Sequence, residues 1–441
     1  MTIYSILHYL IMPLVLLRLF WRGFEAPAYR ERWRERFGFG EFLAPGASRI
    51  WIHAVSVGEA QAAVPIARAL RSRYPNTHIL VTTTTPTGAA HVVRALGDAV
   101  EHRYAPYDLP DCVGRFLERA SPSLLLIMET ELWPNILRAC RERSAPVLLI
   151  NGRLSARSAR AYGRVGRTTR KMLANISVIA AQNRADAERF IALGAEPHGV
   201  RVTGSVKFDI DPSPHAREEG RILRECWGGS RPVWIAASTH EGEEERILRV
   251  FSSVRGAIPD CLLILVPRHP ERFAKVKAQV RRRGYRVLSR SRLLGDGPSS
   301  SDSHARIDVF IGDTMGELPM FYAASDVAFV GGSLVSVGGH NMLEPAALGI
   351  PILFGPHVFN FQEIAHNLRE NGGAKQVETE TDLSTVLVAL LRDAGARRDM
   401  GQRAEAFVQG NRGALDEVMD LVAGVYESDF GGGERHERMG P

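Results

Sequence analysis

The chain has 441 residues, which is too long for one compact core and suits two domains of ordinary size. Hydrophobic residues make up 45% and charged residues 24%, a balance typical of globular proteins, so we expect disorder only in short stretches. The net charge of +6 favours anionic partners without distinguishing phospholipid, nucleic acid and phosphorylated substrates. The four cysteines lie far apart and lack zinc-binding spacings, which argues against a zinc module and indicates free thiols in a reducing compartment.

Residues 1–22 predict a membrane-anchor helix. The chain is almost continuously apolar from Ile3 to Leu17, and residues 19–21 extend this run towards the roughly 20 residues that span a bilayer. No small-residue cleavage site follows, so we expect the anchor to be retained. Six arginines within or after the run keep the rest of the chain cytoplasmic by the positive-inside rule: Arg18, Arg22, Arg30, Arg32, Arg34 and Arg36.

Two alternatives stay open for this region. The apolar run is only marginally long, so it can instead be the buried first helix of a soluble protein. The stretch YRERWRERFG pairs glutamates with arginines at helical spacing. It is either an ordinary solvated face or a basic collar against anionic headgroups.

Beyond the anchor, apolar strands alternate with helix-length amphipathic segments, a pattern typical of a parallel sheet covered on both faces. We predict an α/β protein with two Rossmann-like domains, residues 23–210 and 211–426, and a flexible tail over residues 427–441. Residues 209–214 are the expected linker, and residues 293–303 are an expected mobile loop. Strands are expected at residues 49–54, 78–83, 123–128, 146–150 and 177–181, and then at residues 233–237, 261–266, 286–288, 308–312, 327–330 and 351–354.

Open parallel sheets bind ligands beyond the carboxyl ends of their strands, so two such domains joined by one linker predict a central cleft that both face. The sequence contains neither the P-loop motif G-x-x-x-x-G-K-[ST] nor a well-placed G-x-G-x-x-G. This argues against a P-loop nucleotidase and an ordinary dehydrogenase.

In the first half, the segment WIHAVSVGEAQAA reads as a strand, a short turn and a helix start, with Glu59 at the junction. The helix dipole favours the anionic carboxylate there, so Glu59 can accept a proton from a bound hydroxyl. The alternative is a glutamate that only initiates the helix.

Two further segments place charged side chains at strand ends. METELWPN puts Glu129 and Glu131 directly after a buried strand, either for contact with a substrate or as a structural cap. VTGSVKFD brings Lys207 to the last strand end before the linker, where it can meet a carboxylate or phosphate. An ordinary surface lysine is the alternative.

In the second half, VPRHPERF carries Arg268 and His269 past a strand, where a guanidinium can hold phosphate oxygens. His269 has no partner at a metal-ligand spacing. GDTMGEL opens a helix with Thr314, Met315 and Gly316, a geometry that offers backbone N–H groups to an anion.

The densest stretch is GGSLVSVGGHNMLEPAALGIPILFGP, residues 331–356. Its glycines permit close backbone approach, and Asn341 and Glu344 open a helix. A carboxylate such as Glu344 can accept hydrogen bonds from ribose hydroxyls while the amides of the first turn face phosphate.

These motifs resemble the Kdo transferase family, the inverting GT-B glycosyltransferases that move 3-deoxy-D-manno-octulosonic acid (Kdo) from CMP-Kdo to a lipid A precursor. The resemblance covers nearly the whole chain, because seven segments occur in the family's order: HAVSVGEA, METELWPN, NGRLSARS, TGSVKFD, VPRHPERF, GDTMGEL and GGHNMLEP. It implies that Glu59 is the general base and that Glu129 and Lys207 stabilise the transition state. It implies that CMP is held by Arg268, His269, Met315, Gly316, Glu317, Asn341, Met342, Leu343 and Glu344, although Leu343 can offer only backbone or packing contacts.

The resemblance further implies a single in-line displacement in which Arg268 and a helix N-terminus balance charge on departing CMP, so no metal or cofactor is expected. The expected partners are CMP-Kdo, lipid IVA and the phospholipid surface of the bacterial inner membrane. The rival functions are a UDP-sugar-dependent lipid glycosyltransferase, a nucleotide-sugar epimerase of the same fold and a non-catalytic membrane-bound nucleotide sensor. Nucleic acid is not an expected partner, because the arginines lack an aromatic-interleaved stripe.

Overall fold

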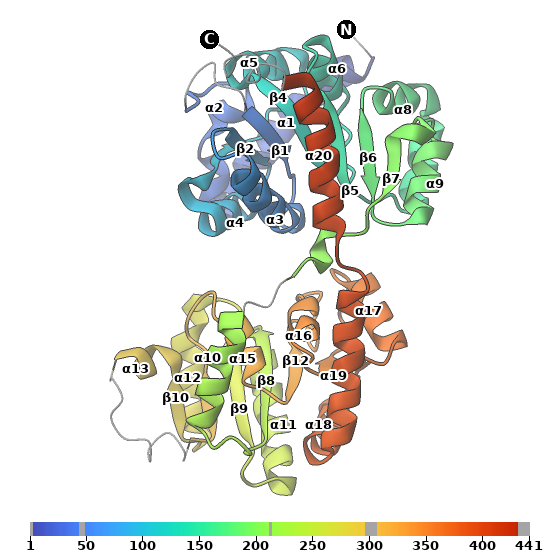
Figure 1. Cartoon of the computed structure of the whole chain (residues 1–441). Coiled ribbons are helices and arrows are strands. Elements are labelled where there is room, and N and C mark those ends of the chain that lie inside the picture. Colours follow the sequence, from blue (N-terminus) through green and yellow to red (C-terminus); the bar gives the residue numbers. More distant parts are fainter. Residues whose placement is uncertain (1–2, 44–48, 211–213, 296–306, 431–441) are drawn as a thin grey trace, which may run out of the picture. The chain divides into compact units, whose positions relative to one another are not determined.

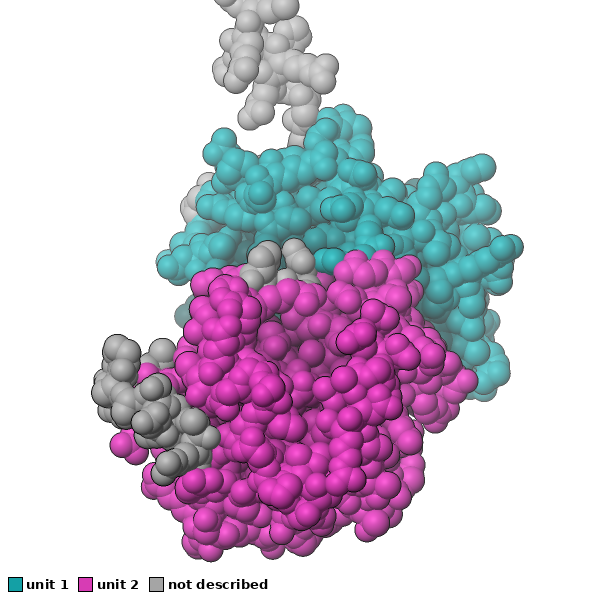
Figure 2. Space-filling model, turned by 60° about the horizontal axis from the view of Figure 1, so that its bottom comes forward, with its two compact units in different colours: residues 1–209, 412–441 teal, residues 210–411 magenta. Residues whose placement is uncertain are grey.

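The computed structural model describes residues 3–43, 49–210, 214–295 and 307–430. These form two compact units, one of residues 1–209 and 412–441 and the other of residues 210–411 (Figures 1 and 2). The centre of the expected linker, most of the expected mobile loop and the end of the expected tail lie outside the described residues. All four cysteines are free thiols, as the sequence predicts.

Unit 1 contains a parallel sheet of seven described strands in the order β3-β2-β1-β4-β5-β6-β7. Alternate residues of each strand point to opposite faces, so Trp51 and Leu125 belong to one hydrophobic core while Ile50 and Leu124 belong to the other. The strands are β1 Arg49–His53, β2 His78–Thr83, β3 Glu101–Tyr104, β4 Pro122–Met128, β5 Val147–Gly152, β6 Val178–Ala181 and β7 Val200–Val202. The helices between them are α3 Val57–Arg73, α4 Pro86–Leu96, α5 Pro110–Ala120, α6 Pro134–Glu142, α7 Ala156–Arg164, α8 Gly166–Leu173 and α9 Arg184–Ala192, with the 3-10 turn η4 at Val206–Phe208.

Unit 2 repeats this plan with seven described parallel strands in the order β10-β11-β9-β8-β12-β13-β14. They are β8 Val233–Thr239, β9 Leu262–Pro267, β10 Val287–Ser289, β11 Val309–Ile311, β12 Val327–Val330, β13 Ile352–Phe354 and β14 Ala374–Gln376. The helices are α10 Pro214–Glu225, α11 Glu243–Ala257, α12 Phe273–Arg282, α13 Arg290–Gly295, α15 Leu318–Ala323, α16 Leu343–Ala347, α17 Gln362–Glu370, α18 Glu380–Arg392 and α19 Ala394–Gln409.

The last described helix, α20 (Ala414–Phe430), belongs to unit 1 although it follows unit 2 in the chain (Figure 1). Val418 and Val422 are fully buried in a core of the first sheet. Asp209 accepts hydrogen bonds from the Gly413 and Leu415 amides, both at 2.7 Å, and so caps the helix. The predicted extent of the second domain, residues 211–426, is therefore corrected to residues 210–411. The expected tail is also shorter, because α20 continues to residue 430.

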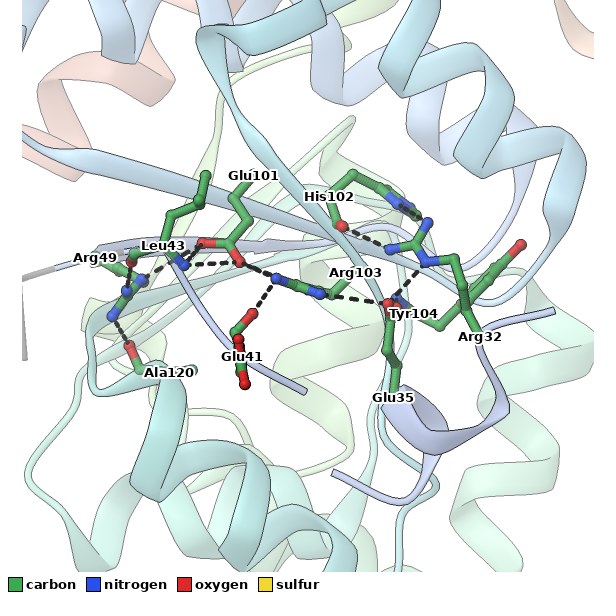
Figure 3. Close-up of polar contacts among 10 residues, drawn as sticks. All are labelled: Arg32, Glu35, Glu41, Leu43, Arg49, Glu101, His102, Arg103, Tyr104 and Ala120. Atoms are coloured by element: carbon green, nitrogen blue, oxygen red, sulfur yellow. Dashed lines mark hydrogen bonds and ion pairs between the residues drawn. The ribbon is translucent and has the colours of Figure 1, made fainter. Parts of the chain in front are cut away.

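Before the first sheet come α1 (Ile3–Glu25), η1 (Pro27–Arg30) and α2 (Trp33–Arg36). Among the described residues, one helix, Ile3–Phe24, is long and apolar enough to cross a bilayer. The segment after it covers edge strand β3: Glu35 accepts the Tyr104 amide at 2.9 Å and Arg32 donates to the His102 carbonyl at 2.8 Å (Figure 3). Such cover satisfies backbone groups that an open sheet edge would expose.

In the stretch YRERWRERFG, for which a basic collar is one of two interpretations, two arginines are occupied by contacts with the protein. Arg32 binds His102 and Glu35 as well, and buried Arg36 donates to the Thr84 carbonyl at 2.9 Å. These residues fasten the segment to unit 1 and are not free for headgroups.

Candidate active site

The candidate site residues of unit 1 lie at a topological switch point. Strands β1 and β4 are neighbours, but the chain leaves β1 towards β2 on one side and β4 towards β5 on the other. The loops after the two strands therefore diverge, which is where open α/β sheets usually bind ligands. Glu59 follows β1, and Glu129 and Glu131 follow β4.

Glu59 lies in the first turn of α3 and is held by a reciprocal cap. Its carboxylate accepts hydrogen bonds from the Val55 amide at 2.8 Å and the Ser56 hydroxyl at 2.7 Å, while the Ser56 Oγ accepts the Glu59 amide at 3.2 Å. Ser56 is therefore the N-cap of α3, and Glu59 is the helix-initiating glutamate that braces it. Glu59 thus does have the helix-initiating role that the sequence offers as an alternative. The cap also fixes its carboxyl in one orientation.

The surroundings of Glu59 suit it to proton transfer. Burial raises its pKa to about 7; the Ser56 hydrogen bond opposes this shift, while the nearby charges of Glu131 and Glu129 add to it. A general base works best when its pKa lies near the working pH. Glu59 can therefore bind or release a proton close to neutrality.

Glu129 and Lys207 form an ion pair with a Nζ–Oε1 distance of 2.8 Å. Glu129 has a left-handed backbone with φ of 55°, a conformation that costs of the order of 1–3 kcal/mol for a non-glycine residue and is concentrated at functional sites. Asn151 at the end of β5 is also left-handed, and its Oδ1 accepts the Ser205 hydroxyl at 3.0 Å and the Val206 amide at 3.3 Å. Asn151 therefore fixes the turn that carries Lys207.

Glu131 is held beside these groups by Trp133, whose indole N–H donates to its carboxylate at 2.9 Å. Burial raises the pKa of Glu131, the Trp133 hydrogen bond lowers it and the charge of Glu129 raises it again. Unit 1 thus brings together three carboxyl groups and one ammonium group from the segments that follow β1, β4 and β7.

Unit 2 has its own switch point between β8 and β12. Glu243, in the first turn of α11, accepts four backbone amides from the loops after these strands: His240 at 3.2 Å, Gly332 at 2.7 Å, Ser333 at 3.2 Å and Leu334 at 3.0 Å. A Cβ atom on Gly331 would lie 2.8 Å from the Ala237 carbonyl oxygen and the Glu243 carboxylate. At Gly331, the glycine therefore allows the backbone to pack closely against other atoms of the protein.

Three histidines gather beside Arg268. The Nε2 atoms of His240 and His340 are 2.7 Å apart in stacked rings, and the His269 ring meets His240 edge-on at 5.2 Å. Burial, together with the charge of Arg268, lowers the pKa of His340 to about 3. Within the described parts of the chain, the Arg268 guanidinium makes no hydrogen bond or ion pair. It is a cationic group available to a ligand.

Asn341 and Glu344 begin the short helix α16. The Asn341 side chain accepts the Leu343 amide at 3.0 Å and donates to the Glu344 carboxylate at 3.1 Å. Burial raises the pKa of Glu344, whereas this hydrogen bond and the charge of Arg268 lower it. Met342 and Leu343 are buried. One amide expected to face phosphate is thus already bonded to Asn341.

Met315, Gly316 and Glu317 lie in the loop after β11. Glu317 binds Arg290 at 2.7 Å and accepts the Thr314 hydroxyl, Gly316 is left-handed with φ of 88°, and Met315 is exposed. No hydrogen bond or ion pair between described residues joins this loop to the Arg268 cluster. The structure therefore presents two groups of candidate donor-site residues in unit 2.

Sequence reasoning missed His240, Glu243 and His340. His240 and Glu243 follow β8 as Glu59 follows β1, so the rule that polar groups at strand ends form sites would have found them if β8 had been extended to Thr239. His340 lies beside Asn341 in the glycine-rich stretch, and only this position could have indicated a functional role.

The fold defines the class of protein. It matches the UDP-GlcNAc 2-epimerase of Neisseria meningitidis bound to UDP-GlcNAc with a TM-score of 0.53 at 13% identity, over 85% of this chain and 99% of that one. It matches a glycosyltransferase from Rickettsia africae with a TM-score of 0.52 at 12% identity, over 86% and 98%. The chain thus has the predicted GT-B architecture of two Rossmann-like domains.

Sequence comparison then gives the family. A family model for 3-deoxy-D-manno-octulosonic-acid transferase (kdotransferase) matches residues 31–210. The 3-deoxy-D-manno-octulosonic acid transferase of Haemophilus influenzae is 40% identical over 421 residues, which cover 95% of this chain and 97% of that protein. The protein of the same name from Bordetella pertussis is 37% identical over 401 residues, 88% of this chain and 90% of the relative. The chain belongs to the Kdo transferase family and is a glycosyltransferase.

Proposed function

We propose that the protein transfers Kdo from CMP-Kdo to the lipid A precursor lipid IVA during lipopolysaccharide assembly, on the cytoplasmic side of the bacterial inner membrane. The observation that carries this proposal is the buried Glu59 carboxyl, whose pKa is about 7, at the switch point of a chain related to Kdo transferases over almost its whole length.

On the acceptor side, Glu59 accepts the proton of the sugar hydroxyl while the hydroxyl oxygen attacks the anomeric carbon of Kdo. The bond from that carbon to the phosphate oxygen breaks, and CMP leaves with the electron pair. Attack opposite the leaving group inverts the anomeric centre. Lys207, oriented by its ion pair with Glu129, stabilises negative charge that develops in the transition state.

On the donor side, Arg268 binds the phosphate of CMP, assisted by His269. The remaining donor contacts come from the other candidate residues of unit 2: Met315, Gly316, Glu317, Asn341, Met342, Leu343 and Glu344. Because a guanidinium supplies the positive charge that the leaving phosphate needs, the reaction proceeds without a metal ion or cofactor.

The test is mass spectrometry of products formed by the purified protein from tetraacyl lipid A precursor and either CMP-Kdo or UDP-sugars. We expect Kdo to be added to the lipid, and only with CMP-Kdo as donor. Transfer of the sugar of a UDP-sugar would contradict the proposal and indicate a UDP-sugar-dependent glycosyltransferase. Epimerisation of a UDP-sugar without transfer would contradict it and indicate an epimerase. Tight CMP binding without transfer to any lipid would indicate the nucleotide sensor.

A further inference from the structure

One face of α1 is partly covered, while the opposite face is open. The covered residues recur at helical spacing: Ser5 and Gly23 are buried, and Tyr4, His8, Met12, Val15, Leu16 and Leu19 are half-buried. On the open face, Ile3, Leu10 and Trp21 are 87%, 71% and 70% exposed. Along its length, α1 therefore has a partly covered face and an open apolar face.

Polar contacts hold the first turns of α1 on unit 1. The Ser5 hydroxyl donates to Asn135 Oδ1 at 3.0 Å, Tyr4 hydrogen-bonds to Asp108, and the Tyr9 hydroxyl donates to Asp111. Asp108 is itself a structural residue, because its carboxylate caps α6 through the amide of Asn135 at 3.1 Å. The start of α1 is therefore attached to the same body as the candidate catalytic carboxylates.

The other end of α1 is held as well. Arg30 of η1 donates to the Phe20 carbonyl at 3.3 Å, and its guanidinium lies 3.9 Å from the centre of the Phe24 ring. A helix of 23 residues is about 34 Å long, which is close to the thickness of the hydrocarbon core. If α1 crossed the bilayer, Tyr4 and Ser5 would lie on the far side of it, and their bonds to Asp108 and Asn135 would be broken.

A strongly basic surface adjoins the start of α1. Tyr162 of α7 lies close enough to interact electrostatically with the Tyr4 hydroxyl. Residues 153–173, which include α7 and α8, contain no acidic residue. Their exposed cations include four arginines that make no side-chain hydrogen bond or ion pair with any described residue: Arg157, Arg160, Arg164 and Arg167.

We propose that α1 lies in the plane of the membrane, with its open apolar face in one leaflet, and that the arginines of α7 and α8 bind the anionic phospholipid headgroups beside it. An apolar face flanked by cations and carrying exposed Trp21 and Phe24 is typical of helices that lie in a membrane interface. This inference rests on the proposed membrane location and changes how the helix is inserted. It places the amino terminus on the same side as the catalytic units.

The side of the amino terminus tests the topology. Intact spheroplasts expressing the full chain with a short amino-terminal epitope are treated with protease, and detergent is added afterwards to show that the epitope can be cleaved. We expect the epitope to survive until detergent is added. Its loss in intact spheroplasts would overturn the in-plane helix, whereas Kdo transfer measured in the same membranes tests the proposed function separately.

Vesicle flotation tests the lipid partner. We expect the full chain to bind vesicles of phosphatidylglycerol and phosphatidylcholine more tightly than pure phosphatidylcholine. The variant R157E/R160E/R164E should bind the anionic vesicles at least about tenfold more weakly, because each cation near such a surface contributes roughly fivefold. The control R281E/R282E/R398E removes three exposed arginines of unit 2 and should bind as wild type. Equal binding by both variants, with unchanged Tm, would contradict the role of α7 and α8.

Discussion

At the scale of single residues, the site of unit 1 combines a structural and a chemical role in one side chain. Glu59 helps to cap α3 together with Ser56, and burial nevertheless keeps its pKa near 7. The hydrogen bonds hold the carboxyl in place, while the neighbouring carboxylates favour its protonated form. A helix cap and a general base are therefore compatible descriptions of the same residue.

The ion pair of Lys207 and Glu129 gives the first prediction. Lys207→Met should lower kcat by about a hundredfold or more, because a preorganised charge is lost from the transition state. It should also move the pH profile of the remaining activity upward, because unpaired Glu129 raises the pKa of Glu59 more strongly. Steady-state kinetics from pH 5 to 9 would measure both effects. Lys207→Arg keeps the charge and should retain more activity; equal losses in the two variants would contradict the electrostatic role.

The free guanidinium of Arg268 gives the second prediction. Arg268→Ala should weaken CMP binding by about 1.5–3 kcal/mol, the usual value of a charged hydrogen bond, and change Tm little, because no described side chain is hydrogen-bonded or ion-paired to it. Titration calorimetry in the presence of EDTA would measure this binding and its independence of metal. Arg281→Ala, an exposed arginine of α12, is the control. Wild-type affinity in Arg268→Ala, or loss of all CMP binding with EDTA, would contradict the donor-site proposal.

At the scale of elements, the sequence predicts most of the two sheets but misses β3, β7 and β14. These strands read EHRY, VRV and AKQ, which are too short or too polar to show a buried-strand pattern. Each lies at the edge of its sheet, where pairing with a neighbour decides the conformation. Glu59 and Glu129 were predictable because they follow recognisable strand ends. Lys207 follows the missed strand β7, and the role of Glu243 depends on loops distant in sequence.

The cap of α20 gives a prediction at this scale. Asp209→Asn should destabilise unit 1 by about 1 kcal/mol, because the carboxylate that accepts the Gly413 and Leu415 amides loses its charge. Thermal unfolding would show this as a lower Tm. Asp416→Asn makes the same change at an exposed position of the first turn of α20 and should have a smaller effect. Equal Tm values for the two variants would argue against the cap.

At the scale of the whole molecule, the chain folds unit 2 as an insertion between two parts of unit 1. The alternation of strands and helices along the sequence does not reveal this return, because α20 has the same amphipathic character as the helices of unit 2. Only the cores show it: Ala414, Val418, Met419 and Val422 complete a hydrophobic cluster of the first sheet.

This connection predicts different outcomes for two truncations. A chain ending at residue 411 loses several buried side chains from unit 1, each worth about 1.5–3 kcal/mol. The total is comparable to the stability of a domain, so we expect unfolding of unit 1, measured as rapid proteolysis within residues 49–209. A chain ending at residue 430 keeps α20 and should resist protease as the full chain does. Equal resistance of both truncations would show that α20 is dispensable.

The central claim is that Glu59 is the base that activates the acceptor, and the pH dependence of kcat/KM tests it most directly. A base acts as the carboxylate, so a raised pKa means that wild-type activity rises with pH through about 7 and is lost below it. Glu59→Gln should be slower by about 10² to 10⁴, lack this rise and remain folded, because the amide oxygen can still accept one of the two cap hydrogen bonds. Near-normal turnover by folded Glu59→Gln, with the same pH dependence as wild type, would contradict the account.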